Sequence, residues 1–201
     1  MHKMWLALVG LLGLAAVAAT AAAAELEITP QDRVMGQANA PITVIEYASM
    51  TCPHCARFQL TVFPDVKKDW IDTGKVKWVL RDFPLDAVAL KAAMVARCAP
   101  ADRFYAFADT FLTAQDQWMR GKNVEASLAR MAQLGGMSPA EVSACLNNKQ
   151  VQEEVVNSRL VANKQLGVDS TPTFFINGKK VAGEMDSAHF VKLLSEAQAK
   201  S

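Results

Sequence analysis

Two cysteines stand three positions apart in the run Cys52-Pro53-His54-Cys55, the part of this sequence best suited to chemistry. A spacing of three places both sulfurs on one face of a helix, where they can close a small disulfide with little backbone change. A histidine between them adds a hydrogen-bond donor and, when protonated, a positive charge. The pattern therefore predicts a redox-active cysteine pair.

The flanking residues place this pair at the junction of a strand and a helix. Residues 42–47 are mostly β-branched or aromatic and predict a buried strand. Ser49 and Thr51 are good helix N-caps, and Pro53 suits the first helical position. A thiol in the first turn of a helix meets unpaired backbone N–H groups and the positive end of the helix dipole, which favour its thiolate.

Metal binding is the weaker interpretation of the same cysteines. A structural zinc site takes four ligands, whereas residues 25–201 contain only His54 and His189 as histidines and no second close cysteine pair. A Cu(I)-binding thiol module stays open as a less favoured alternative. We expect neither a metal nor another cofactor.

Residues 1–24 have the composition of a signal peptide. A short basic start at Lys3 precedes an apolar stretch, and small residues end at Ala24 before Glu25. We therefore expect export to the periplasm as a soluble protein, with an uncleaved membrane anchor as the alternative. All four cysteines would then lie where disulfides persist.

The segment 25–201 is long enough for one domain with a substantial core. Without Lys3 its basic and acidic residues balance. A balanced charge argues against nucleic acid or an anionic membrane surface as a partner.

The periodicity of the chain predicts an α/β protein. A second strand over 75–81 follows the first helix, and two strands joined by one helix form a parallel βαβ unit. Pro64 should break the first helix, residues 86–148 read as helical throughout, and a further helix stops at Gly167. Late strand signals at 173–176 and 179–181 are joined by the hairpin turn Asn177-Gly178. Residues 25–40 are expected to form a tail or an edge strand, and Asp186 can cap a final helix.

From about residue 36 to its end, the chain resembles the DsbA family of exported thiol-disulfide oxidoreductases. The resemblance is carried by CPHC after a strand, by Thr171-Pro172 ahead of the late hairpin, and by the helical block between them. It implies a thioredoxin-like fold, a central mixed sheet flanked by helices, with a helical subdomain inserted at about 86–148.

The order of the two cysteines suggests their roles. Cys52 is nearer the helix terminus and solvent, so we expect it to exchange with substrate, while Cys55 resolves the mixed disulfide. His54 is expected to favour the Cys52 thiolate electrostatically. The resemblance also implies a strong oxidant, because a stabilised thiolate favours the reduced enzyme.

Three further residues take roles from the resemblance. Thr171-Pro172 fits the family's cis-proline loop, where the Thr171 backbone would pair with an extended client. The best-known DsbA oxidants carry valine before this proline, and threonine is similar to the isomerase branch. Glu46, six residues before Cys52, matches the family's buried acid, which could relay a proton to or from Cys55. Its other interpretation is an edge-strand carboxylate that faces water.

Cys98 and Cys145 both fall in the helical block. They could be inert buried thiols, or a structural disulfide between two helices of the insertion. Some DsbA-like proteins carry such a second bridge. In the chain-entropy model a loop of this length contributes roughly 4 kcal/mol.

The leading functional hypothesis is an exported oxidase that donates the Cys52–Cys55 disulfide to other exported proteins. The resemblance implies reoxidation by a quinone-linked membrane protein similar to DsbB. A disulfide isomerase or reductase is the nearest alternative. Isomerases of the DsbC kind carry an N-terminal dimerisation domain, and residues 25–40 leave no room for one, so we expect a monomer.

Overall fold

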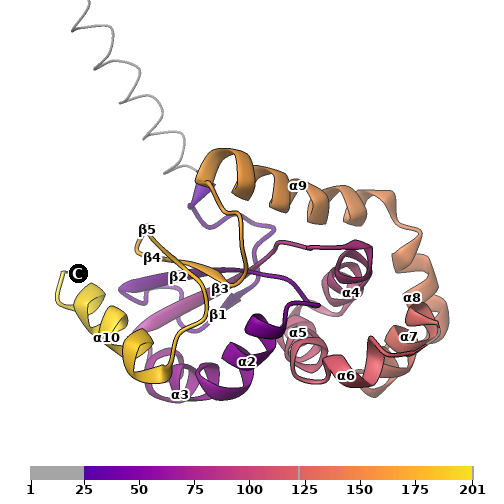
Figure 1. The fold of residues 1–201 in the computed structure, drawn as a ribbon, viewed down its shortest axis with the longest axis horizontal. Helices are drawn as coiled ribbons and strands as arrows, with labels where there is room; N and C mark the ends of the chain where they lie inside the picture. Colours follow the sequence, from indigo (N-terminus) through magenta and orange to yellow (C-terminus); the bar gives the residue numbers. More distant parts are fainter. Residues whose placement is uncertain (1–24, 122, 201) are drawn as a thin grey trace, which may run out of the picture.

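The computed structural model describes residues 25–121 and 123–200, and the predicted signal peptide lies outside this part. One five-stranded sheet has the strand order β1-β3-β2-β4-β5 (Figure 1). Its strands are β1 (Val34–Met35), β2 (Ile42–Ala48), β3 (Val76–Asp82), β4 (Thr173–Ile176) and β5 (Lys179–Ala182). β2 pairs parallel with β3 and antiparallel with β4, which confirms the predicted βαβ unit and the mixed sheet.

Local signals set the two edges of the sheet. β1 pairs antiparallel with β3, so part of the segment 25–40 is an edge strand. β4 and β5 form a hairpin in which Asn177 has φ 46° and Gly178 has φ 81°. Positive φ at both central positions is what a type I′ turn requires, and this explains the Asn-Gly pair.

The helices include several that begin or end at recognisable caps. They are α2 (Pro53–Thr61), α3 (Phe63–Val66), the π-helical η1 (Lys67–Ile71), α4 (Ala87–Cys98), the 3-10 turn η2 (Ala101–Arg103), α5 (Phe104–Thr113), α6 (Gln115–Trp118), α7 (Val124–Leu134), α8 (Pro139–Leu146), α9 (Lys149–Leu166) and α10 (Ser187–Gln198). Ser138 and Glu141 form the capping box of α8, Asp186 caps α10, and α9 ends at Gly167 with φ 62°. The predicted break occurs at Val62, two residues before Pro64.

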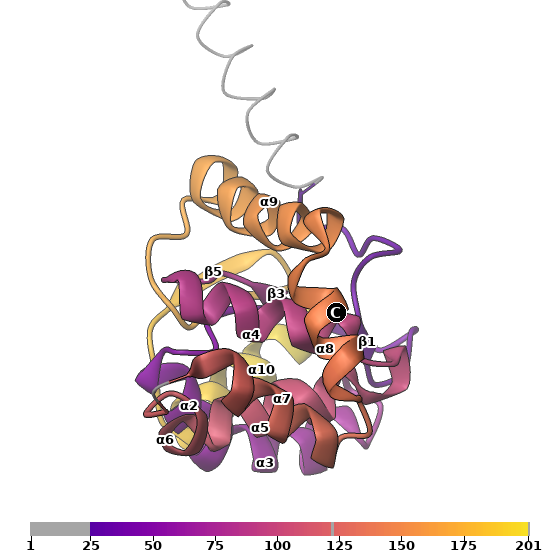
Figure 2. The same cartoon turned by 90° about the vertical axis from the view of Figure 1, so that its right-hand side faces the viewer.

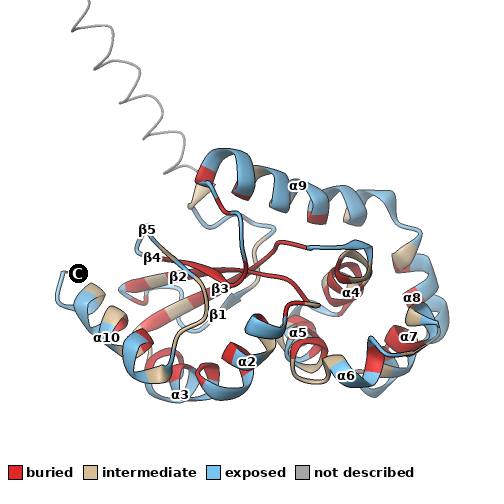
Figure 3. Cartoon of the chain, in the orientation of Figure 1, coloured by how far each residue is buried: buried red, intermediate tan, exposed pale blue. Residues whose placement is uncertain are grey.

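Helices cover both faces of the sheet. In Figure 1, α2, α3 and α10 lie on one face and α9 lies on the other. Side chains alternate along β2, so Val44 packs in the core beneath α2 and α10, whereas Ile45 and Tyr47 pack in the core beneath α9. Figure 3 shows β2, β3 and β4 mostly buried and the outer side of α9 exposed.

The helices α4 to α8 gather at one end of the sheet, which Figure 2 shows from that end. Their apolar core is built on rings such as Phe104, Phe111 and Trp118. A disulfide joins Cys98 at the end of α4 to Cys145 in α8. Cys52 and Cys55 belong to the same apolar cluster. The inserted helices therefore pack directly on the cysteine pair.

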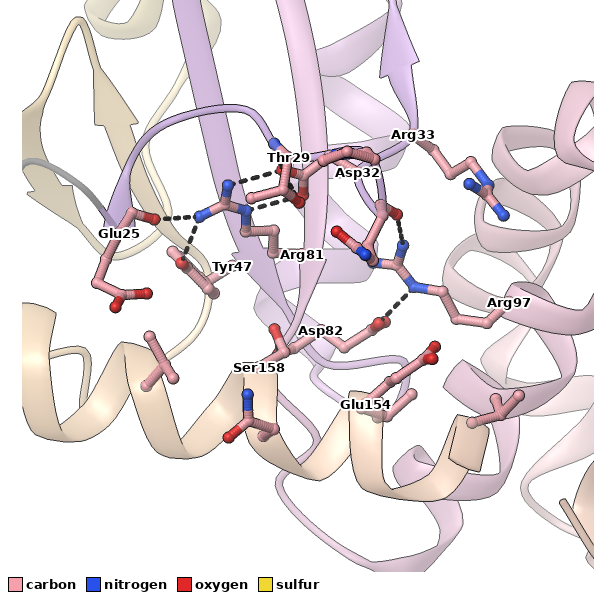
Figure 4. Close-up of a pocket in the computed structure, with 16 residues that line it drawn as sticks. Glu25, Thr29, Asp32, Arg33, Tyr47, Arg81, Asp82, Arg97, Glu154 and Ser158 are labelled. Carbon is pink, nitrogen blue, oxygen red and sulfur yellow. Dashed lines mark hydrogen bonds and ion pairs between the residues drawn. The ribbon is translucent and has the colours of Figure 1, made fainter. Parts of the chain in front are cut away.

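Arg81 in β3 fixes the segment ahead of β1. Its guanidinium donates to Asp32, to the Tyr47 hydroxyl and to the backbone carbonyl of Glu25 (Figure 4). It also donates to the backbone carbonyl of Glu27. Glu25, Asp32 and Tyr47 border a cavity of about 540 Å³ between the N-terminal segment, β3 and α9. Because each arm of the guanidinium is already bound, we interpret these contacts as an anchor for the chain.

No helix within residues 25–121 and 123–200 is both long enough and apolar enough to cross a membrane.

Candidate active site

The CPHC motif lies between the end of β2 and the first turn of α2. Cys52 itself is the N-cap, with an extended backbone and no side-chain cap, and Pro53 occupies the first turn. The prediction that Ser49 or Thr51 caps this helix is wrong. Their hydroxyls contact each other, and Thr51 also donates to Asp86 at the start of α4. The N–H groups of the first turn are therefore left to act on the Cys52 sulfur.

The two thiols have opposite acid–base character. Both are reduced, and Cys52 is 3% exposed while Cys55 is fully buried. A hydrogen bond from Cys55 is the largest cause that lowers the pKa of Cys52, to about 5; burial opposes this shift, while Thr171 and the backbone N–H groups of Cys55 and His54 add to it. Burial, the hydrogen bond to Cys52 and the charges of Glu46 and Cys52 raise the pKa of Cys55. At neutral pH the pair is thus one thiolate beside one thiol.

The imidazole of His54 engages a residue that the sequence did not indicate. Its Nδ1 lies 2.7 Å from Glu184 Oε2, and Arg57 Nη1 lies 3.2 Å from the same oxygen. Glu184 stands in the loop between β5 and α10, 130 positions from His54. No local signal in the sequence marks this pairing, because it depends on how the loop folds over α2.

The loop before β4 lies against the first cysteine. The Thr171–Pro172 peptide bond is cis. Cys52 Sγ lies 3.3 Å from the Thr171 carbonyl oxygen. The Thr171 hydroxyl is buried and has no other hydrogen-bond partner among the described residues, so it can turn toward Cys52, and this contact lowers the pKa of the thiol.

Glu46 lies in the centre of the sheet, on the face that carries α2. β2 is flanked by β3 and β4, so Glu46 is not on an edge strand, and it is 1% exposed. Burial raises the pKa of Glu46 to about 8; Trp78 opposes the shift, and the charge of Cys52 adds to it. Its Oε1 has no hydrogen-bond partner among the described residues. At neutral pH this carboxyl is mostly protonated and electrostatically coupled to both cysteines.

Gln115, at the start of α6, binds residues 50–52, the catalytic loop that leads into α2 and carries Cys52. The sequence did not indicate this residue either. Its Nε2 donates to the backbone oxygens of Met50 and Cys52, at 2.9 Å and 3.0 Å. A single side-chain amide from the inserted helices thereby fixes the Met50–Thr51 and Cys52–Pro53 peptide groups. Side-chain contacts to backbone groups 63 and 65 positions away leave no trace in local sequence patterns.

In residues 25–121 and 123–200, no group of three or more histidine, cysteine, aspartate or glutamate side chains is arranged to hold a metal ion.

Comparison with known proteins agrees with this geometry. The thioredoxin family model matches residues 28–196. The crystal structure of α-DsbA1 from Wolbachia pipientis is 33% identical, with a TM-score of 0.81 over 87% of this chain and 94% of that chain. BdbD from Bacillus subtilis in its oxidised form has a TM-score of 0.76 over 84% of this chain and 94% of its own, but at 22% identity it supports the fold alone.

A Rickettsia felis protein, provisionally named a protein-disulfide oxidoreductase, is 38% identical over 154 residues. The match covers 76% of this chain and 55% of that protein. The chain therefore spans about half the length of the curated Rickettsia relatives that it matches.

Proposed function

The chain belongs to the DsbA family of thioredoxin-fold proteins, and we propose that it is an exported thiol:disulfide oxidoreductase that donates the Cys52–Cys55 disulfide to folding exported proteins. The observation that carries this proposal is the asymmetry of the two thiols: the pKa of Cys52 is lowered to about 5, whereas that of Cys55 is raised. A stabilised Cys52 thiolate favours the reduced pair, which makes the oxidised pair ready to accept electrons.

The reaction proceeds by two exchanges. A client thiolate attacks Cys52 Sγ of the oxidised pair, and the electron pair of the broken S–S bond passes to Cys55. A second client thiolate then attacks the client sulfur of the mixed disulfide, and Cys52 leaves as a thiolate. The client gains one disulfide, and the enzyme gains two electrons as a thiolate and a thiol.

Glu46 has the protonation state that this cycle requires. The sulfur of Cys55 leaves as a thiolate in a buried site, where the neutral thiol is the favoured form. Glu46 is protonated at neutral pH and borders a cavity of about 420 Å³, so it can supply the proton that Cys55 takes up. In the reverse direction it accepts that proton when Cys55 attacks.

The loop at Thr171-Pro172 is the proposed docking point for clients. A client strand laid along the Thr171 backbone would present its cysteine to Cys52, which lies 3.3 Å from the Thr171 oxygen. Signal-peptide composition of residues 1–24 supports export to the periplasm. A DsbB-like quinone-linked membrane protein as reoxidising partner, and a monomeric state, follow from the family and remain parts of the proposal.

A disulfide isomerase is the second candidate, and Thr171 is the residue that favours it. Its hydroxyl is free to turn toward the Cys52 sulfur, an interaction that valine could not make. Oxidase and isomerase are separated by comparing oxidation of a reduced model protein with repair of a scrambled one. The oxidase proposal expects rapid oxidation and poor repair; repair at a rate matching oxidation would favour the isomerase.

The proposed roles are tested by trapping. Cys55→Ala leaves Cys52 able to attack but removes the resolving thiol, so mixed disulfides with exported proteins should accumulate on non-reducing gels. Cys52→Ala should abolish them. Equal trapping by both variants would contradict the assignment of Cys52 as the exchanging thiol.

A further inference from the structure

The side chain of His54 is hydrogen-bonded to Glu184. Its Nδ1 is 2.7 Å from Glu184 Oε2, while the contribution of His54 to the Cys52 thiolate comes through the backbone N–H. The side chain of His54 therefore pairs with Glu184, whereas a counter-ion for the thiolate would pair with the Cys52 sulfur. Its imidazole is 57% exposed and is oriented by Glu184.

A carboxylate oxygen can only accept a hydrogen bond, so the hydrogen must be on Nδ1. In the neutral ring this leaves Nε2 with a free lone pair. An unrestrained histidine in water prefers the opposite tautomer, with its hydrogen on Nε2. Glu184 thus selects the form in which the free basic atom is Nε2, the logic by which a carboxylate orients a histidine base in other enzymes.

Arg57 supports this arrangement from the same helix face. It stands three positions after His54 on α2, and its Nη1 is 3.2 Å from Glu184 Oε2. The carboxylate therefore faces two donors, and its side chain is 20% exposed. The other acidic group at this groove, Asp186, accepts from the backbone N–H of His189 as the cap of α10.

His54 also borders the proposed client site. A groove of about 580 Å³ is lined by His54, Arg57, Thr171 and Glu184, among others. Thr171 lines this groove and its carbonyl oxygen lies 3.3 Å from Cys52 Sγ, so a client cysteine that approaches Cys52 alongside Thr171 would do so at the edge of the groove. The free Nε2 would meet it there.

We propose that Glu184 is a positioning residue that holds His54 as the proton acceptor for the incoming client thiol. This inference rests on the proposed oxidase function. The client S–H gives its proton to Nε2 as its sulfur bonds to Cys52 Sγ, and the Cys52–Cys55 bond breaks with its electron pair on Cys55. The proton on His54 then passes to water.

The tautomer is read directly by NMR of histidine labelled with ¹⁵N in the ring. With the ring neutral, the wild-type protein should show the Nδ1–H form, and Glu184→Ala should revert to Nε2–H. Glu184→Gln, whose amide oxygen can still accept from Nδ1, should retain part of the wild-type signature. A matched control is Glu196→Gln, an exposed glutamate on α10, which should leave the spectrum unchanged. An Nε2–H form in the wild type, or no difference in Glu184→Ala, would overturn the inference.

The kinetic consequence is tested with the oxidised protein and a short cysteine peptide across pH. Glu184→Ala should slow the first exchange about tenfold at neutral pH, below the usual range for general base catalysis because the ring itself remains. In a His54→Ala background the same change should have no further effect, since both act as one unit. A tenfold loss that persists without His54 would contradict the inference. Failure of the proposed function would look different: the wild type itself would not oxidise the peptide, whatever its tautomer.

Discussion

The buried carboxyl of Glu46 should lower the free energy of unfolding of the reduced protein as the pH rises, and Glu46→Gln should remove this loss. Folding raises the pKa of Glu46 from 4.5 to about 8 because the carboxyl is buried. A group whose pKa is raised in the folded state contributes its full stability below pH 4.5. That stability is lost as the pH rises toward 8, because the unfolded chain ionises freely and the folded one does not.

The size of the effect follows from the two pKa values. One pKa unit corresponds to about 1.4 kcal/mol, so the difference in protonation lowers the free energy of unfolding by about 3 kcal/mol at pH 7. Glutamine has nearly the same shape and no charge to form. Cys52 titrates with the opposite slope, since its pKa is lowered, but this contribution is common to both proteins and cancels in the comparison.

The assay is urea unfolding of both reduced proteins at several pH values between 4.5 and 8. The advantage of Glu46→Gln over wild type should grow by about 3 kcal/mol between pH 4.5 and pH 7. Glu196→Gln, which changes an exposed glutamate, should show no such growth. A constant difference across this range would refute the burial-driven shift and with it the proposed proton donor for Cys55.

Three other predictions concern the surroundings of the pair. Replacing both Cys98 and Cys145 with alanine should lower the free energy of unfolding by about 4 kcal/mol, because the bridge spans 47 residues; recovery of both as free thiols from unreduced wild type would contradict the bridge. Gln115→Leu should lower the free energy of unfolding by about 2 kcal/mol and raise the pKa of Cys52, because two carbonyls of the catalytic loop lose their donor. Gln117→Leu, which changes an exposed residue of the same helix, should do neither. His54→Ala keeps the backbone N–H through which residue 54 acts on Cys52, so the pKa of Cys52 should stay close to that of the wild type in a thiolate absorbance titration; a clearly raised pKa would show that the imidazole itself stabilises the thiolate.

Local signals predicted most of the fold. The capping box at Ser138, the turn at Asn177-Gly178 and the break before Pro64 are each decided by a few adjacent residues, and the structure has all three. The strand-then-helix placement of Cys52 was predictable for the same reason. The capping error at Ser49 and Thr51 shows the limit, since both hydroxyls found partners and left Cys52 as the N-cap.

Part of the candidate site could not be predicted, because it depends on contacts between residues far apart in the sequence. Glu184 reaches His54 only because the loop after β5 folds over α2, and Gln115 reaches the catalytic loop only because the inserted helices pack on the cysteines. Both are ordinary polar residues in surface-like stretches of sequence. They differ in this from Glu46, whose position in an apolar strand marked it as unusual.

The redox poise of Cys52–Cys55 in glutathione buffers tests the central claim most directly. Because the Cys52 thiolate is stabilised, with a pKa of about 5, the reduced pair should be favoured. We expect an equilibrium potential near about −120 mV, the range of a strong oxidant. A potential near about −270 mV, the range of a thioredoxin-like reductant, would contradict the proposal that this protein donates disulfides.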